Sequence, residues 1–186
     1  MDTALIAALK AQAPLTVLLT TLTLPDRTVR LTDGGFVDWS GSTYRARDDL
    51  YGVLSQIEEI DDGADDQATR CAITILPPDA VAMAQLANPA TQGAPVTVHL
   101  GAVTRETGLL LGEPDLLFQG ELDFGRLGVG ESWSLILECG TEEARCLEPN
   151  ADQRLSDPYH KAIWPGERGF EHVTDTTRKI HWTWKR

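Results

Sequence analysis

The sequence predicts a mainly β protein, a β barrel or sandwich with one short helix inserted and an arm at the C-terminus. Three observations lead to this fold class. Apolar and polar residues alternate in several short runs, turn residues separate these runs at close intervals, and one helical pattern interrupts them. The chain has 186 residues, of which 42% are hydrophobic, so it is long enough to build one core without disulfides or metals.

The N-terminal segment, residues 1–14, is predicted to hold a helix over 2–12. Asp2 is a suitable N-cap, and Pro14 ends the helical pattern. An apolar stripe at spacings of three and four residues consists of Leu5, Ile6 and Leu9.

The first strands are predicted at 15–24 and 28–33, on either side of a Pro-Asp-Arg turn. A compact hairpin follows over 36–45, where Ser40-Gly41-Ser42 reverses the chain. Trp39 and Tyr44 place one aromatic residue on each arm of this hairpin.

An acidic stretch over 46–66 indicates the rim of two strands joined by a solvated loop. The next strand is predicted at 69–76, and a short helix capped by Asp79 follows at 80–88. Three further strands are predicted at 95–104, 116–124 and 131–139, with a Gly-rich turn before the last. Residues 15–140 therefore form the predicted β domain.

The composition changes in the last part of the chain, 141–186, which is predicted to be a helical or extended arm. It holds three of the five Trp residues, and Lys and Arg outnumber Asp and Glu from residue 150 onward. Large aromatic side chains next to charges are typical of interfaces. The expected anchors on a neighbouring subunit are Trp164, Phe170, Trp182 and Trp184. The alternative is that the arm folds back on its own core.

The densest acidic run contains Glu58, Glu59, Asp61, Asp62, Asp65 and Asp66. Unpaired carboxylates are costly to bury, so this run is expected to be a surface loop. It lacks the ligand spacing of a calcium-binding EF-hand, which makes a cation site the weaker interpretation.

Motifs for catalysis, cofactors or metals are missing from the sequence. No P-loop, HExxH, GxSxG or dinucleotide-binding pattern occurs, and Cys71, Cys139 and Cys146 have no zinc-ligand spacing. The sequence thus predicts a protein that is not an enzyme and that uses no cofactor and no metal. A cation-dependent hydrolase would need convergent carboxylates such as Glu58 and Asp61.

The charge of the chain bears on its partners. The formal net charge is -12, which disfavours specific binding to nucleic acid. The N-terminus has no basic region followed by a long apolar run, so neither a signal peptide nor a membrane span is predicted. We expect the protein to stay in the cytoplasm until it is assembled.

Two segments resemble a known family. The segment FVDWSGSTYRA, the acidic rim and TRCAITILPPDAVAMAQLANPATQGAPVTVHLG resemble the N-terminal ring domain of lambda-type siphophage tail-tip proteins, the distal tail and baseplate hub minor tail proteins. The hairpin residues that carry the resemblance are Val37, Trp39, Gly41 and Tyr44. The run DQRLSDPYHKAIWPGERGFEHV is similar to the ending of many phage minor tail proteins through Pro165, Gly166, Gly169, Phe170 and Val173, with Glu167 where Asp is common.

The resemblance implies a tail-tube-like β barrel in a virion structural protein. Its copies would form a ring at the distal end of a long tail, joining the tail tube protein to hub or fibre proteins around the DNA channel. The acidic run would then face the channel. The resemblance does not extend to the cysteine-rich iron–sulfur module of the larger hub proteins, because this chain has only three cysteines. The alternative function is a carbohydrate- or receptor-binding β module of the tail tip, with Trp39 and Tyr44 as an exposed aromatic platform.

Overall fold

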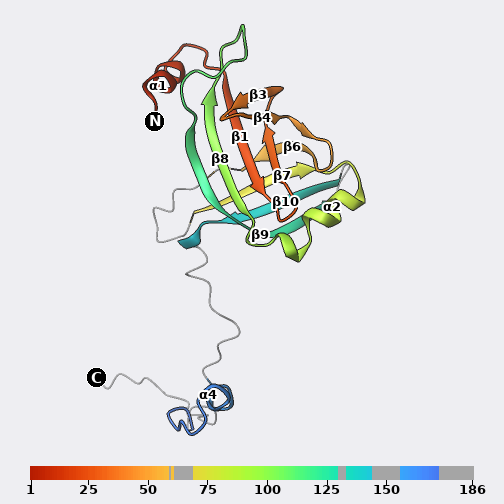
Figure 1. Cartoon of the computed structure of the whole chain (residues 1–186), viewed down its shortest axis with the longest axis vertical. Coiled ribbons are helices and arrows are strands. Elements are labelled where there is room, and N and C mark those ends of the chain that lie inside the picture. The colour runs from red at the N-terminus through yellow and green to blue at the C-terminus, as the bar shows by residue number, and fades with distance from the viewer. Residues whose placement is uncertain (59, 61–68, 130–132, 144–155, 172–186) are drawn as a thin grey trace, which may run out of the picture. The chain divides into compact units, whose positions relative to one another are not determined.

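The computed structural model describes residues 1–58, 60, 69–129, 133–143 and 156–171 (Figure 1). The chain divides into two compact units, Met1–Leu147 and Glu148–Arg186. The elements are α1 (Thr3–Leu9), β1 (Thr16–Thr23), β2 (Thr28–Thr32), β3 (Phe36–Trp39), β4 (Ser42–Arg45), β5 (Arg47–Asp48), β6 (Gly52–Ile57), β7 (Arg70–Leu76), α2 (Ala80–Leu86), the 3-10 helix η1 (Pro89–Thr91), β8 (Pro95–Ala102), β9 (Asp115–Val129), β10 (Trp133–Gly140) and α4 (Asp157–Ile163). The prediction of a mainly β fold is confirmed.

The strands of the first unit form one sheet with the order β3-β4-β2-β1-β8-β9-β10-β7-β6-β5. Its pairings are antiparallel, except that β2 and β4 meet in parallel at Leu31 and Arg45. The sheet curls until β5 and β6 lie against β2, which gives a barrel rather than a two-sheet sandwich.

Side chains close the barrel where β5 and β6 meet β2. Arg27, in the turn before β2, forms an ion pair with Asp48 at 2.6 Å and lies over the ring of Tyr51 at 5.6 Å. The backbone amides of Leu50 and Tyr51 both donate to Asp48 Oδ1, at 2.9 and 3.0 Å. One carboxylate therefore shapes the turn into β6 and ties that turn to β2.

The long strand β9 links the two halves of the barrel by pairing with β8 and then with β10. Both pairings contain a register shift, and such bulges let a strand bend. Gly120 lies between the two register shifts, and a side chain at this position would run into the backbone oxygen of Gly140. The Gly-rich stretch after residue 124 was expected to be a turn, but β9 continues through it to Val129.

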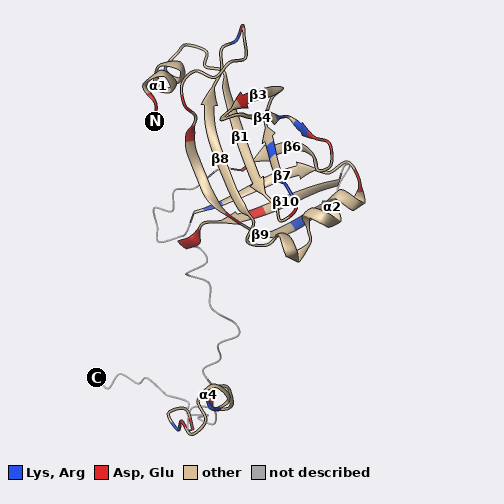
Figure 2. Ribbon diagram, in the orientation of Figure 1, with Lys and Arg blue, Asp and Glu red and all other residues tan. Residues whose placement is uncertain are grey.

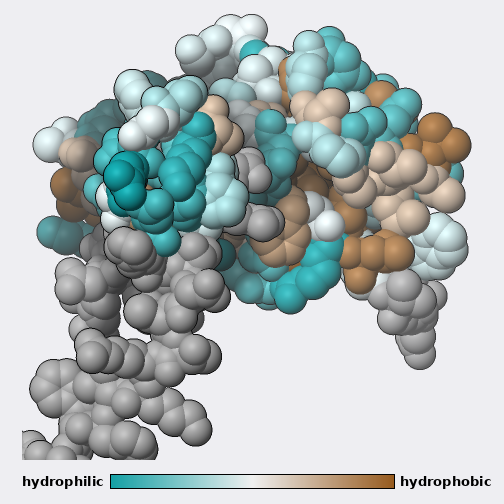
Figure 3. Space-filling model, turned by 90° about the horizontal axis from the view of Figure 1, so that it is seen from below, coloured by the Kyte–Doolittle hydropathy of each residue, from teal (hydrophilic) through white to brown (hydrophobic). Residues whose placement is uncertain are grey.

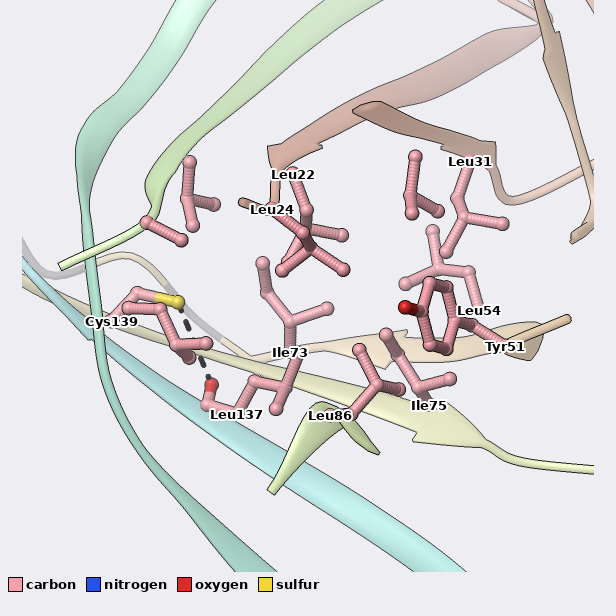
Figure 4. Packing of buried hydrophobic residues seen from close by; sticks show 14 of the residues in the cluster. Leu22, Leu24, Leu31, Tyr51, Leu54, Ile73, Ile75, Leu86, Leu137 and Cys139 are labelled. Carbon is pink, nitrogen blue, oxygen red and sulfur yellow. Dashed lines mark hydrogen bonds between the residues drawn. The ribbon is translucent and has the colours of Figure 1, made fainter. Parts of the chain in front are cut away.

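The interior of the barrel is one apolar cluster drawn from both halves of the sheet. Figure 4 shows Leu22, Leu24 and Leu31 on one side facing Ile73, Ile75 and Leu54 on the other. Helix α2 adds Ala82 and Leu86 to this cluster. The α2 prediction is confirmed, including its cap, because Asp79 accepts a hydrogen bond from the Ala82 amide at 2.8 Å.

A second, smaller cluster lies on the outer side of β1, under the β3–β4 hairpin. Val17 and Leu19 of β1 pack there against Val37 and Tyr44 of the hairpin. Alternate residues of β1 thus serve two cores, since Leu22 points into the barrel. The hairpin turn has positive φ at both Ser40 (50°) and Gly41 (71°), as in the type I′ turn that fits strand twist.

Helix α1 is held to the loop before β9 by its capping residue. Asp2 Oδ1 accepts from the Ala4 amide at 2.9 Å, and Asp2 Oδ2 accepts from the Glu113 amide at 2.9 Å. These backbone hydrogen bonds, the one from Glu113 first, lower the pKa of the Asp2 carboxyl below its ordinary value. The helix is shorter than the predicted 2–12 and ends at Leu9, with Leu5 fully buried.

Candidate interaction surfaces

The two sets of residues predicted from the sequence fall only partly within the described structure. Among the acidic residues, Glu58 is placed, exposed at the end of β6, while Glu59, Asp61, Asp62, Asp65 and Asp66 lie outside the described residues. Among the expected anchors, Trp164 and Phe170 are placed, and Trp182 and Trp184 are not described. The predicted arm interface and channel loop remain predictions.

The second unit exposes an apolar pair at the end of α4. Ile163 is 51% and Trp164 63% exposed. Phe170, by contrast, packs on His160 of its own unit with ring centroids 4.6 Å apart. The helix is supported by a Lys161–Asp157 ion pair at 2.9 Å. Of the two described aromatic anchors, Trp164 is therefore the one available to another molecule.

Trp39 and Tyr44 do not form an exposed platform. Tyr44 is 5% exposed and hydrogen-bonds Thr21 Oγ1 at 2.9 Å. Trp39 is half-buried, donates from Nε1 to Glu113 at 2.9 Å, and meets the ring of His99 edge-on at 4.7 Å. Burial lowers the pKa of His99, whose Nδ1 is buried and has no hydrogen-bond partner among the described residues. These aromatic residues hold the hairpin on the barrel.

The two described cysteines lie opposite each other on β7 and β10, and both are free and buried. Burial raises the pKa of the Cys71 thiol to about 11 and also raises that of Cys139. A thiol with a raised pKa is a poor nucleophile and a poor metal ligand. No group of three or more His, Cys, Asp or Glu within the described ranges is placed to hold a metal ion.

One end of the barrel opens into a pocket of about 530 Å³, here called the mouth. Most of its walls are apolar, and its lining consists of Leu18, Ile57, Glu58, Ile60, Thr69, Val98, Leu117, Phe118, Gln119 and Thr141. Thr141 Oγ1 is buried without a hydrogen-bond partner in the described structure. Glu142 and Glu143 come directly after Thr141 and are exposed, and Figure 2 shows this acidic segment after the end of β10.

A different part of the barrel exposes large apolar side chains near α2. Gly125 of β9 lies at the end of α2, where an added methyl group would be 3.6 Å from Ala87 Cα. Farther along the β9–β10 hairpin Leu127 and Trp133 are about half exposed, and Val81 of α2 is 65% exposed. Most apolar residues in the view of Figure 3 gather in its right half, where α2 lies. We call Val81, Leu127 and Trp133 the α2 surface.

No family model matches this chain, and a search of curated proteins finds no relative. No helix among the described residues is long and apolar enough to cross a membrane. What the fold and its surfaces define is a mainly β protein, a barrel whose described residues expose apolar side chains in several places.

Proposed function

We propose that this protein is a structural subunit of a bacteriophage tail tip. Its copies form a ring at the distal end of a long tail, between the tail tube protein and the hub or fibre proteins. The ring surrounds the DNA channel, and the protein has no catalytic role. This proposal goes beyond the fold class and takes its direction from the family resemblance of the sequence.

The observation that carries the proposal is the number of unlike apolar surfaces on one small barrel. The mouth, the α2 surface and the exposed Phe36 of the hairpin lie on different parts of the first unit, and Trp164 adds one in the second. Apolar patches rimmed by polar residues often mark protein–protein contact sites. A ring closes by heterologous contacts, which require each subunit to present two different faces.

The charge of the chain supports the same proposal. A channel that passes DNA needs walls that repel phosphate, and a net charge of -12 has the appropriate sign. We propose that the acidic run from Glu58 to Asp66 faces this channel. The arm, with Trp164 as its described anchor, is proposed to pack on a neighbouring subunit.

Replacing Trp164 with alanine is expected to remove the protein from tails without unfolding the barrel. A large interface anchor typically contributes about 2 kcal/mol or more, so the amount incorporated should fall by at least about tenfold. The measurement is quantitative mass spectrometry of purified tails from cells in which the variant replaces the wild-type protein.

Arg168→Ala is the matched control, because Arg168 is exposed in the same unit and its ion pair within the described residues is a local one, with Glu171 at 2.8 Å. Its incorporation should equal that of the wild type. Absence of the wild-type protein from purified tails would overturn the proposal, and normal entry of Trp164→Ala would overturn the role of the arm.

A further inference from the structure

Phe36 is the most exposed large apolar side chain among the described residues, at 70%. It begins β3 and pairs across the hairpin with Arg45 of β4. The next pair, Val37 and Tyr44, faces the opposite way and is buried against β1. Because successive residues of a strand point to opposite faces, Phe36 stands on the outer face of a hairpin whose inner face is fixed to the barrel.

Two arginines lie beside Phe36. Arg45 and Arg47 line, with Phe36, a shallow hollow of about 570 Å³ on the outer face of the hairpin. Within the described structure neither guanidinium has an ion-pair partner, whereas Arg27 and Arg126 are paired. The acid of this hollow, Asp38, accepts a hydrogen bond from Thr43 Oγ1 at 2.5 Å. On a chain of net charge -12, this is an aromatic group flanked by free positive charge.

The mouth has the complementary properties. Most of its walls are apolar, with Ile57 and Leu117 among them, and its volume of about 530 Å³ is in the range of pockets that enclose ligand groups. Its border is acidic, because Glu58 lines it and the exposed Glu142 and Glu143 follow the lining residue Thr141. An aromatic ring flanked by guanidinium groups can pack against the apolar walls while the guanidinium groups pair with the carboxylates of the border.

A subunit cannot fill its own mouth with its own Phe36. The mouth opens onto the inner face of β1, where Leu18 lines it, whereas the hairpin packs on Val17 and Leu19 of the outer face. Phe36 points away from that outer face. The wall of the barrel therefore separates the two, and only a second molecule can bring such a group to the mouth.

We propose that Phe36 of one copy inserts into the mouth of a second copy, with Arg45 and Arg47 pairing with Glu58, Glu142 and Glu143 at its border. The contact joins two different faces, so it repeats from copy to copy and closes into a ring or continues as a filament. This inference rests on the proposed function, because it names the contact between neighbouring copies of the ring.

The test is self-association of the full chain, measured by sedimentation velocity in low and in high salt. Phe36→Ser should weaken association by about 10- to 100-fold, the equivalent of removing one fully buried aromatic side chain. Leu109→Ser is the matched control, because Leu109 is 66% exposed and lines neither the mouth nor the hollow beside Phe36, so its replacement should leave association unchanged.

Charge reversal tests the border separately. Arg45→Glu with Arg47→Glu should weaken association by about tenfold in low salt, and less in high salt, because surface ion pairs are screened. Arg105→Glu, on the loop that carries Leu109, should change nothing. Adding Glu142→Arg and Glu143→Arg to the double variant should restore association, because the charges are then exchanged across the same contact.

A photoreactive phenylalanine analogue at position 36 gives a readout that does not depend on stability. Its crosslinks should map by mass spectrometry to peptides of a second copy that contain Ile57 or Leu117.

Crosslinks elsewhere, equal association of Phe36→Ser and Leu109→Ser, or a wild-type protein that stays monomeric at its highest soluble concentration would overturn the inference. If Phe36→Ser assembles normally while wild type enters tails, the contact is wrong and the function stands. If the contact is found but the protein is absent from tails, the function is wrong.

Discussion

Replacing Leu137 with alanine is expected to lower the free energy of unfolding by about 2–5 kcal/mol. Leu137 is fully buried in the barrel cluster on β10. Its cross-strand neighbours are Ile73 on β7 and Gly125 on β9, and Gly125 has no side chain that could move in to fill a cavity. The expected decrease in the free energy of unfolding therefore lies in the range found for buried leucines whose neighbours cannot move in to fill the cavity.

Equilibrium denaturation in urea, followed by tryptophan fluorescence, measures this loss. Leu109→Ala is the control, since Leu109 is 66% exposed and its truncation should change the free energy of unfolding by no more than about 0.5 kcal/mol. Equal effects of the two substitutions would show that β10 is not the centre of the core.

Gly52→Ala is the second substitution with a large expected effect, about 2 kcal/mol or more of destabilisation. Gly52 begins β6 with φ of +93°, a conformation that side chains with a Cβ rarely adopt. An added methyl group would also run into the backbone oxygen of Leu76, which cannot move without disturbing β7. The substitution strains the seam where the barrel closes on β2.

Gly108→Ala separates the two causes. Gly108 also has a positive φ, +68°, but nothing lies within 4 Å of an added methyl group. Gly108→Ala should lower the free energy of unfolding by only about 1–2 kcal/mol, because only the backbone conformation disfavours the new side chain. Thermal unfolding of both variants measures how much more Gly52→Ala destabilises the protein than Gly108→Ala does, and this difference is the effect of the clash with Leu76. Equal destabilisation would contradict the close packing of Gly52 against β7.

Local patterns in the sequence were enough to predict most of the elements. The strands at β1, β2, β7, β8 and β10 follow alternation of apolar residues, and Asp79 marks the start of α2 through a bond to an amide three residues away. The hairpin of β3 and β4 follows from Ser40-Gly41, the two residues that take positive φ. Each of these features is decided by residues close together in the chain.

The features that were missed depend on contacts between distant residues. Gly125 reads as a turn residue, but it lies within β9, where it pairs with Leu137 of β10 and the end of α2 lies close by. Trp39 was a candidate for an exposed platform, and its role is decided by Glu113, 74 residues later. The mouth joins Leu18, Val98 and Phe118, which become neighbours only through the pairing of β1, β8 and β9. Sequence periodicity carries no information about such pairings.

The proposed ring is tested most directly by cryo-electron microscopy of tails. The tails are purified from the phage particles that are produced in cells expressing this gene. We expect barrels of this fold repeated around the channel at the distal end of the tube, each contacting the next through unlike faces. Tails in which no density at the tip fits this barrel, or in which it occurs away from any ring, would contradict the proposed ring.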